Sequence, residues 1–395
     1  MYTLEMKRFI KRRGVVWLTL IVFALSALLG FSVVWLAFEY NIPGREATDY
    51  TARGRDAIAY RRSQTELIEG DYTAADIAEL ERRYDAGLRT GSAPEDDAIV
   101  EPAIRFFNKI DFVVDKMGGE RSDYFEARKE LIEFLAWDGE AAMKLDAGAA
   151  EPFRYEYGIG DSDAEVYVCV CQLVIALASA GVASTVFTRD YATGAYDIMS
   201  CARHGKGRFA RTKILAAMSY SALMYLICCG LFSAIVLISF GPDSSAAQFK
   251  GAFNTNYVMV PGGITSNGFY ALCVLAGFLS TLALTGFALW VSSFSSNSLL
   301  SLALTVLMAL LPYACIPLSG IADIDMTWPV WLENLLPSGS FSLINGMRFQ
   351  LINLRFLSFC GLSLWTPFVM LAAPVIETPL FALLARRAYM RHECA

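Results

Sequence analysis

The chain has 395 residues, of which 55% are hydrophobic and 18% charged, and its formal net charge is −6. The charged residues are unevenly distributed, because residues 251–322 contain no Asp, Glu, Lys, Arg or His. One charged side chain at the centre of a bilayer costs about 2.5–3.5 kcal/mol, whereas the core of a soluble protein has no need of so long an uncharged stretch. The composition therefore excludes an ordinary soluble domain and predicts an all-α, polytopic membrane protein.

A basic segment precedes the first predicted span. The first 13 residues contain five Lys or Arg residues, and residues 15–38 then contain no charge. A spanning helix requires about 20 apolar residues, so this run is long enough. It is too long for the apolar region of a signal peptide and lacks a small-residue cleavage site. We expect it to stay in the protein as span 1.

Residues 39–164 form a long polar segment whose pattern predicts a helical domain. Thr73 and Asp76 are spaced as a capping box at the start of an amphipathic helix. Apolar residues at helical spacing predict a second helix over residues 98–117, ended by two glycines, and a third that begins at Ser122. These apolar stripes are explained by packing against one another, and no individual residue supports a ligand groove among them.

Five further spans follow from the remaining apolar runs. The last of these contains three prolines, which spanning helices tolerate where neighbouring groups satisfy the freed carbonyls. Before it, Trp328, Trp331 and Phe341 suit short half-buried helices at the membrane interface. The chain thus divides into residues 1–38 with span 1, 39–164, 165–187 with span 2, 188–213, 214–317 with spans 3 to 5 (214–240, 269–291 and 298–317), 318–355 at the interface, and 356–395 with span 6 inside 356–385.

Three short segments carry the basic charge that determines orientation. Residues 1–13, 188–213 and 386–395 together contain 14 Lys or Arg and four acidic residues, whereas residues 39–164 contain 16 basic and 29 acidic ones. Lys and Arg in short loops tend to stay on the cytoplasmic side. We therefore expect both termini and residues 188–213 in the cytoplasm, residues 39–164 outside the cell, and a multi-pass protein of the plasma membrane.

Neither cysteines nor histidines are spaced for a disulfide framework or a metal site. The nine cysteines lie outside residues 39–164, and the two histidines, His204 and His392, are far apart in the chain. Paired acids such as Asp96 and Asp97 have no identifiable nucleophile or base beside them. The acidic extramembrane residues also argue against nucleic-acid binding. The sequence predicts no catalytic site and no cofactor in this chain.

The most informative segment is residues 188–213, a short charged stretch between two spans. It can form a helix that docks on a cytoplasmic partner and transmits force to both flanking spans, or it can be an ordinary basic loop. The segment begins with an acid–aromatic pair and a glycine, continues with an apolar pair and a serine, and closes with a Gly–Lys pair and a lysine before the next span. These positions are Asp190-Tyr191, Gly194, Ile198-Met199-Ser200, Gly205-Lys206 and Lys213.

This pattern resembles the coupling region of type-2 ABC transporter permeases, which serve bacterial ABC exporters. Asp190 stands where Glu is usual, Ala195 where Thr is usual and Lys206 where Arg is usual, so the charges and the spacing are kept. The basic N-terminus, as an elbow helix along the inner membrane surface, and residues 329–348 before the last span are also similar to that family. The resemblance covers most of the chain apart from residues 39–164.

The resemblance implies a six-span permease subunit that works with partner chains. Two such subunits, identical or related, would form a pathway, and two cytoplasmic subunits that bind ATP and Mg would push on the coupling region. The sequence contains no G-x-x-x-x-G-K-[ST] phosphate loop, so the ATPase would be another chain. The positions that the resemblance assigns to partner coupling are Asp190, Tyr191, Gly194, Ile198, Ser200, Gly205, Lys206, Arg208, Arg211 and Lys213.

Glu377 is the one acid deep inside a predicted span, and such a residue is a candidate for lining a pathway. A structural role toward the cytoplasmic third of the span is the alternative. Two other functions stay open. A secondary transporter would normally show repeated halves and several buried charges. A sensor or mechanotransmitter would act through residues 39–164 and the same coupling region.

Overall fold

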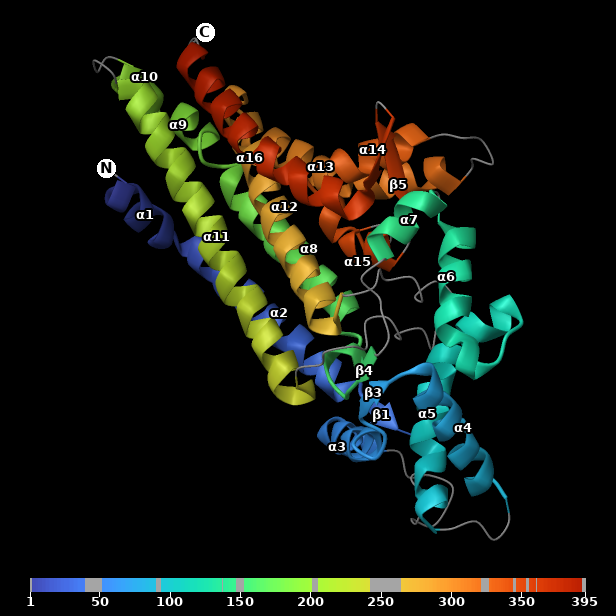
Figure 1. Cartoon of the computed structure of the whole chain (residues 1–395). Helices are drawn as coiled ribbons and strands as arrows, with labels where there is room; N and C mark the ends of the chain where they lie inside the picture. The colour runs from blue at the N-terminus through green and yellow to red at the C-terminus, as the bar shows by residue number, and fades with distance from the viewer. Residues whose placement is uncertain are drawn as a thin grey trace.

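The protein is a bundle of long helices with a separate helical arm at one end (Figure 1). The bundle and the arm both appear in the computed structural model, whose described residues are 2–39, 52–89, 94–136, 138–146, 153–200, 205–241, 264–320, 327–343, 346–352, 355–359 and 361–392.

Six helices of this described part are long and apolar enough to cross a membrane. The prediction of a polytopic, mainly helical membrane protein is therefore confirmed. The third of these helices is longer than the expected span, because it begins at Gly205 and so includes part of the predicted coupling segment. The six helices are α2 (Arg13–Trp35), α8 (Ala164–Ala183), α11 (Gly205–Phe240), α12 (Ser266–Phe294), α13 (Ser298–Gly320) and α16 (Thr366–Arg391).

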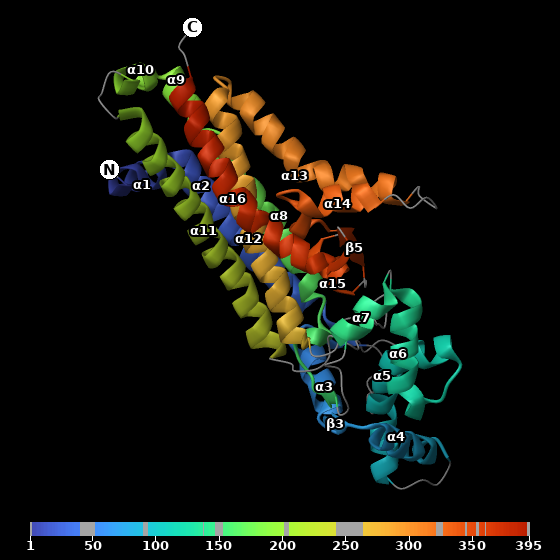
Figure 2. The same ribbon diagram turned by 45° about the horizontal axis from the view of Figure 1, so that its top comes forward.

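Helix α12 lies at the centre of the bundle, between α8, α11 and α16, while α13 diverges from it (Figures 1 and 2). Glycine allows the closest approaches. A Cβ added at Gly277 would lie 2.3 Å from Cδ of Gln172 on α8, and one at Gly286 would lie 3.2 Å from Cβ of Phe381 on α16. The Gln172 amide donates to the carbonyl of Cys273 at 3.0 Å, so a buried polar group is satisfied across the same helix pair.

The outer faces of the bundle are apolar. Ile238 of α11 is 82% exposed and Leu299 of α13 is 75% exposed, and both belong to a larger set of exposed leucines, isoleucines and phenylalanines on the six helices. A soluble protein rarely exposes so much contiguous apolar surface. These faces therefore fit hydrocarbon as their solvent.

The arm comprises the elements from β1 to η2, which connect α2 to α8. Thr73 and Asp76 form the predicted capping box at the start of α4, and α5 ends before Gly118, whose φ of +73° suits glycine. Helices α3 and α7 were not predicted. The arm consists of β1 (Phe38–Glu39), β2 (Ala52–Arg53), α3 (Arg55–Thr65), β3 (Gly70–Tyr72), α4 (Ala74–Gly87), α5 (Pro94–Met117), η1 (Arg121–Asp123), α6 (Tyr124–Leu135), α7 (Gly139–Asp146), β4 (Phe153–Tyr155) and η2 (Ile159–Asp161).

The described part of this mainly helical chain also contains three short antiparallel strand pairs. Two lie in the arm, β1 with β2 and β3 with β4. The third joins β5 (Phe356–Phe359) to β6 (Leu362–Trp365), with Phe356 opposite Trp365. It lies at the start of the range 356–385 in which span 6 was expected, and the last spanning helix begins at Thr366.

The segment before this hairpin enters the bundle more deeply than predicted. It contains α14 (Thr327–Leu335), η5 (Gly339–Phe341) and α15 (Met347–Ile352). Trp328 is exposed and Phe341 is fully buried inside the protein, and the place of this segment at the membrane interface stays a prediction. The Ser340 hydroxyl donates to the carbonyl of Met370 at 3.4 Å, and this is the carbonyl that Pro374 leaves without a helical partner.

Candidate coupling site

Two short helices, α9 (Thr188–Ala192) and α10 (Ala195–Ser200), connect α8 to α11 at the bundle end opposite the arm (Figures 1 and 2). The C-terminal end of α16 lies at this same end, which we name the α9–α10 end. Gly194 separates the two helices with a φ of +66°, a conformation that favours glycine after a helix. The predicted coupling segment is thus a helix–turn–helix rather than an open loop.

A buried ion pair attaches α9 to α11. Lys213 donates from Nζ to Oδ1 of Asp190 and, at 3.4 Å, to the carbonyl of Val186. Asp190 is 6% exposed and Lys213 4%, so neither side chain lies on the surface where a partner would bind. Removing one member of such a pair costs about 3–5 kcal/mol, because the other charge is left buried and unpaired. The structure therefore gives these two predicted contact residues a positioning role.

Tyr191 connects α9 to two other helices. Its hydroxyl donates to the carbonyl of Ser293 at 2.5 Å, at the end of α12. Its ring stacks on the imidazole of His392, with centroids 4.1 Å apart, and lies 6.0 Å from the ring of Tyr389 on α16. A single side chain of the segment thus contacts both α12 and the C-terminal end of α16.

Tyr196 makes a second connection, from α10. Its hydroxyl donates to the carbonyls of Tyr389 and His392, and it accepts a hydrogen bond from Nζ of Lys206 at 2.8 Å. The Lys206 ammonium also lies 4.6 Å from the centroid of the Tyr196 ring, close enough for a cation–π interaction. Tyr196, Tyr389 and His392 were not among the predicted site residues, since nothing in the sequence pairs residues nearly 200 positions apart.

The remaining predicted residues are distributed over the surface of this end. Arg208 and Arg211 are exposed on α11, and Gly205 is half-buried at its start. Ile198 and Ser200 lie in α10, but their side chains fall outside the described part of the structure. From the end of α9 to the middle of α10, the exposed positions are Ala192, Thr193 and Asp197. These form the surface that is open to a partner.

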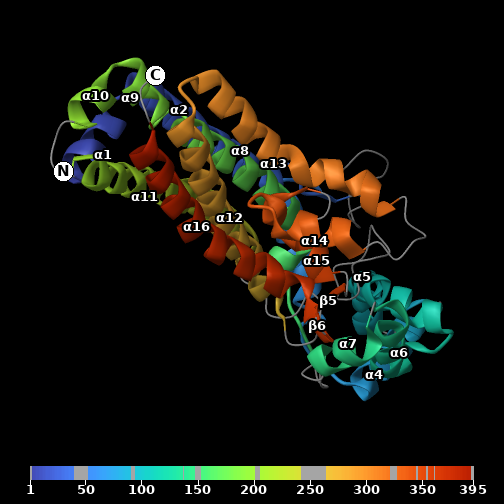
Figure 3. The same ribbon diagram turned by 90° about the horizontal axis from the view of Figure 1, so that it is seen from above.

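Helix α1 (Tyr2–Ile10) lies across the same end of the bundle, as the view from above shows (Figure 3). Phe9 is buried and stacks on Tyr220 of α11, with centroids 6.4 Å apart. Glu5 is also buried, and it accepts a hydrogen bond from Nη1 of Arg8 at 2.8 Å. One face of α1 is therefore anchored to α11, close to the Asp190–Lys213 pair.

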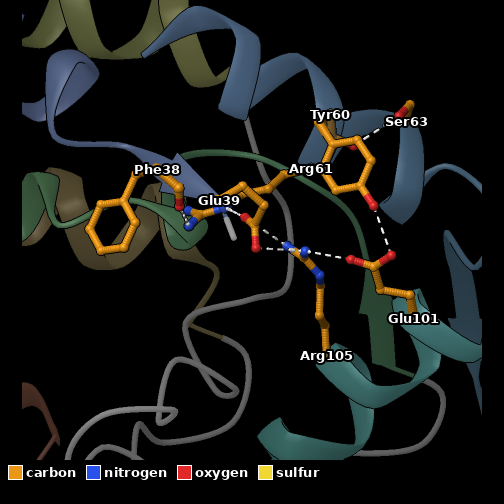
Figure 4. A network of polar contacts seen from close by, with 7 residues as sticks. All are labelled: Phe38, Glu39, Tyr60, Arg61, Ser63, Glu101 and Arg105. Carbon is orange, nitrogen blue, oxygen red and sulfur yellow. Dashed lines mark hydrogen bonds and ion pairs between the residues drawn. The ribbon is translucent and has the colours of Figure 1, made fainter. Parts of the chain in front are cut away.

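At the opposite end, a polar network joins the bundle to the arm (Figure 4). Glu39, just after α2, accepts from Arg61 Nε of α3 at 2.5 Å and from Arg105 Nη2 of α5 at 2.7 Å. Arg61 also donates to the carbonyl of Phe38 at 2.7 Å. We name Glu39, Tyr60, Arg61, Glu101 and Arg105 the joint network.

Charge balance supports the joint network. Glu101 accepts from the Tyr60 hydroxyl at 2.7 Å and from Arg105 Nη2 at 3.2 Å. Burial by itself would lower the pKa of Arg105, but its hydrogen bonds to Glu39 and Glu101 raise the pKa overall. The guanidinium therefore stays charged between two carboxylates, and two helices of the arm are fixed to the end of α2.

A neighbouring arginine connects the arm to a second spanning helix. Arg62 donates from Nη2 to the carbonyl of Phe240, the last residue of α11, at 2.9 Å. Carbonyls at a helix C-terminus lack helical donors, so a cation here both satisfies one and suits the helix dipole. Because Arg61 and Arg62 are adjacent, α3 holds the ends of α2 and α11 together.

Glu377 lies in α16 between Pro374 and Pro379, half-buried. Its Oε2 atom is buried and has no hydrogen-bond partner within the described residues. The structure does not pair it with Arg386, so its candidacy as a pathway residue stays a prediction.

No protein-family model matches the chain, and no curated protein is significantly similar to it. The resemblance to type-2 ABC permeases therefore rests on the motif in residues 188–213 and its order among the spans.

Proposed function

We propose that the chain is the membrane subunit of an ATP-driven ABC exporter. A separate cytoplasmic subunit binds ATP and Mg, and a second permease subunit, identical or related, completes the pathway. In this proposal both termini and the α9–α10 end face the cytoplasm, the arm lies outside the cell, and the membrane is the plasma membrane.

The observation that carries the proposal is the attachment of one short segment to three spanning helices. Lys213 connects it to α11, Tyr191 to the end of α12, and Tyr196 to the end of α16. A partner that pushes on α9 and α10 would displace these helix ends together, as rigid-body switching requires. An ordinary basic loop has no need of buried contacts with three helices.

The orientation is tested by labelling single added cysteines in intact cells with a membrane-impermeant maleimide. Thr193→Cys should stay unlabelled until the cells are opened, whereas Glu130→Cys on the exposed side of α6 should react at once. Each signal is read above that of the unaltered chain. Labelling of Thr193→Cys from outside would invert the topology and end the export proposal.

The partner is tested by purifying the full chain from its own membranes with whatever ATPase it retains. We expect vanadate-sensitive ATP hydrolysis and a co-purified chain that carries a phosphate-binding loop. The pair Ala192→Arg and Thr193→Arg, on the exposed turn after α9, should abolish retention of that ATPase. Glu130→Arg in the arm is the matched control. Equal retention by both variants would refute the α9–α10 surface as the docking site.

Mechanotransmission without transport is the second candidate, and the joint network favours it, because the arm is fixed to the spanning helices rather than attached by a loose linker. Inside-out vesicles that contain the purified complex distinguish the two. ATP-dependent accumulation of a cargo in the vesicles supports export. Absence of accumulation, together with ATP-dependent protease exposure of the arm in the same complex held in lipid nanodiscs, where both faces are accessible, supports mechanotransmission. Accumulation driven by a proton gradient without ATP would instead indicate a secondary transporter and point to Glu377.

A further inference from the structure

A basic surface surrounds the start of α2 at the α9–α10 end. Lys7 and Lys11 are exposed on and just after α1. Leu4 and Ile10 of the same helix are 62% and 56% exposed, although apolar. A helix that presents both cations and apolar side chains to the outside suits the boundary between lipid headgroups and acyl chains.

Two arginines of this surface form no ion pair with any residue that the structure describes. Arg12 has its guanidinium 4.8 Å from the centroid of the Phe9 ring, which fixes its position. Arg189 is exposed at the start of α9 and forms no ion pair within the described residues. Burial, and next the nearby charge of Arg189, lower the pKa of Arg12. The two cations thus repel each other and together favour an anion.

The neighbouring acids are already engaged with other cations. The carboxylates that act on Arg12 are those of Glu5 and Asp190, and Arg8 is a further cation beside it. Glu5 accepts from Arg8, and Asp190 accepts from Lys213. Both acids thus already pair with another cation, although their charges still act to raise the pKa of Arg12.

The depth of the surface matches the headgroup layer. Helix α2 has 23 residues, beginning at Arg13, and spans about 34 Å at 1.5 Å per residue, which is close to the thickness of the hydrocarbon core. Arg12 immediately precedes this helix, so it lies where phosphates of one leaflet are found. This placement holds for either orientation of the protein.

We propose that Arg12 and Arg189 bind the phosphate of an anionic phospholipid headgroup, with Leu4 and Ile10 in contact with the acyl region. The bound lipid bridges α1 to α9, and so attaches the N-terminal helix to the candidate coupling segment. The site does not depend on the proposed transport function. An acidic surface of a protein partner is the competing occupant.

The test is native mass spectrometry of the full chain, titrated with phosphatidylglycerol or with phosphatidylcholine of the same acyl chains. Arg12→Gln with Arg189→Gln should weaken phosphatidylglycerol binding about 25-fold, since each basic residue near an anionic surface contributes about fivefold. The control, Arg208→Gln with Arg211→Gln, removes equal charge from exposed positions of α11 and should change binding less than about threefold. Arg12→Lys with Arg189→Lys keeps the charge and should retain most of the binding.

Measurements on the unaltered chain keep the proposal falsifiable if the glutamine variant does not fold. Phosphatidylglycerol should bind more tightly than phosphatidylcholine, and binding should weaken as salt increases. Millimolar inorganic phosphate should not displace the lipid, because it lacks the acyl chains that Leu4 and Ile10 contact.

Four results would overturn the assignment. Equal weakening in both double variants would indicate non-specific attraction by surface charge. Absence of a headgroup preference would exclude an anionic lipid site. Displacement by inorganic phosphate would identify a site for a free anion. Loss of the co-purified ATPase from the glutamine variant, with lipid binding unchanged, would identify the protein partner as the occupant.

Discussion

The two ends of the bundle are held together by different chemistry. At the α9–α10 end, the Asp190–Lys213 ion pair is buried, and the Lys213 ammonium lies 4.6 Å from the centroid of the Phe209 ring. At the arm end, the joint network is half-buried, and several arginine–carboxylate contacts together attach the arm to the bundle. In the buried pair, the Coulomb attraction is strong, but loss of one partner leaves the other charge buried and unpaired. In the joint network each contact is weaker, but the remaining contacts can compensate for the loss of one. The α9–α10 end therefore fixes the position of α9 precisely, whereas the arm end attaches the arm to the bundle through several contacts.

Breaking the buried pair should have the largest effect. Lys213→Met leaves the Asp190 carboxylate buried without its cation and should lower the free energy of unfolding by about 3–5 kcal/mol. The double variant Asp190→Asn with Lys213→Met should recover much of this loss, because it removes both charges. Denaturant unfolding in detergent measures both. A single variant as stable as the unaltered chain would show that the pair is not buried in solution.

Breaking the joint network should have a smaller effect. Glu39→Ala removes the acceptor of both Arg61 and Arg105 and should cost about 1–3 kcal/mol, a loss that shrinks as salt increases. Glu79→Ala breaks an exposed arginine–carboxylate pair within α4 and is the control, with no measurable loss expected. A salt-independent loss at Glu39 would mean that packing, not charge, forms the joint.

Removing the connection from α3 to α11 should be milder still. Arg62→Ala deletes the hydrogen bond to the Phe240 carbonyl and should cost about 1 kcal/mol. The effect should be local, so backbone amides in the last turn of α11 should exchange with solvent faster while those around Tyr220 stay unchanged. Uniformly faster exchange along α11 would instead show that Arg62 supports the whole helix.

The smallest expected effect depends on pH and concerns a contact between the arm and the β5–β6 hairpin. Ser363 donates to the carboxylate of Asp138, and this hydrogen bond lowers the pKa of Asp138. A carboxyl with a lowered folded pKa contributes stability above its unfolded pKa of about 4, and loses it as pH falls through the folded value. Hairpin amides should therefore exchange faster at a pH below the lowered pKa of Asp138 than near neutrality, once corrected for intrinsic exchange rates. Asp138→Asn should show no such change.

Local signals in the sequence predicted part of the fold. The capping box of Thr73 and Asp76 and the end of α5 before Gly118 depend on neighbouring residues alone, and the uncharged stretches depend on the solvent that surrounds them. These predictions were confirmed. The hydropathy of residues 356–385 predicted a span within that range but did not reveal the β5–β6 hairpin at its start, because a short apolar hairpin and the start of a spanning helix have the same hydropathy.

Most of the candidate site depends on contacts that the sequence does not reveal. The motif identified Asp190 and Lys213 but did not predict that they would form a buried ion pair. It also did not predict the hydrogen bond from Tyr191 to the carbonyl of Ser293. Burial reverses the interpretation of Asp190, from a group offered to a partner to one that holds α9 in place. Such a distinction arises only from packing, which one sequence does not encode in local spacing.

The tight contact at Gly277 limits how α12 can move. The side-chain amide of Gln172 fills the space beside Gly277 and donates to the carbonyl of Cys273, so a buried side chain joins α8 to α12 at this point. The carbonyl of Ser293, which accepts the hydrogen bond from Tyr191, lies 16 residues beyond Gly277 along α12, about 24 Å at 1.5 Å per residue. A displacement of Tyr191 would therefore act on α12 far from the hydrogen bond that Gln172 makes to it, and the packing of α12 against α8 and α16 would decide how much of that displacement reaches its other end.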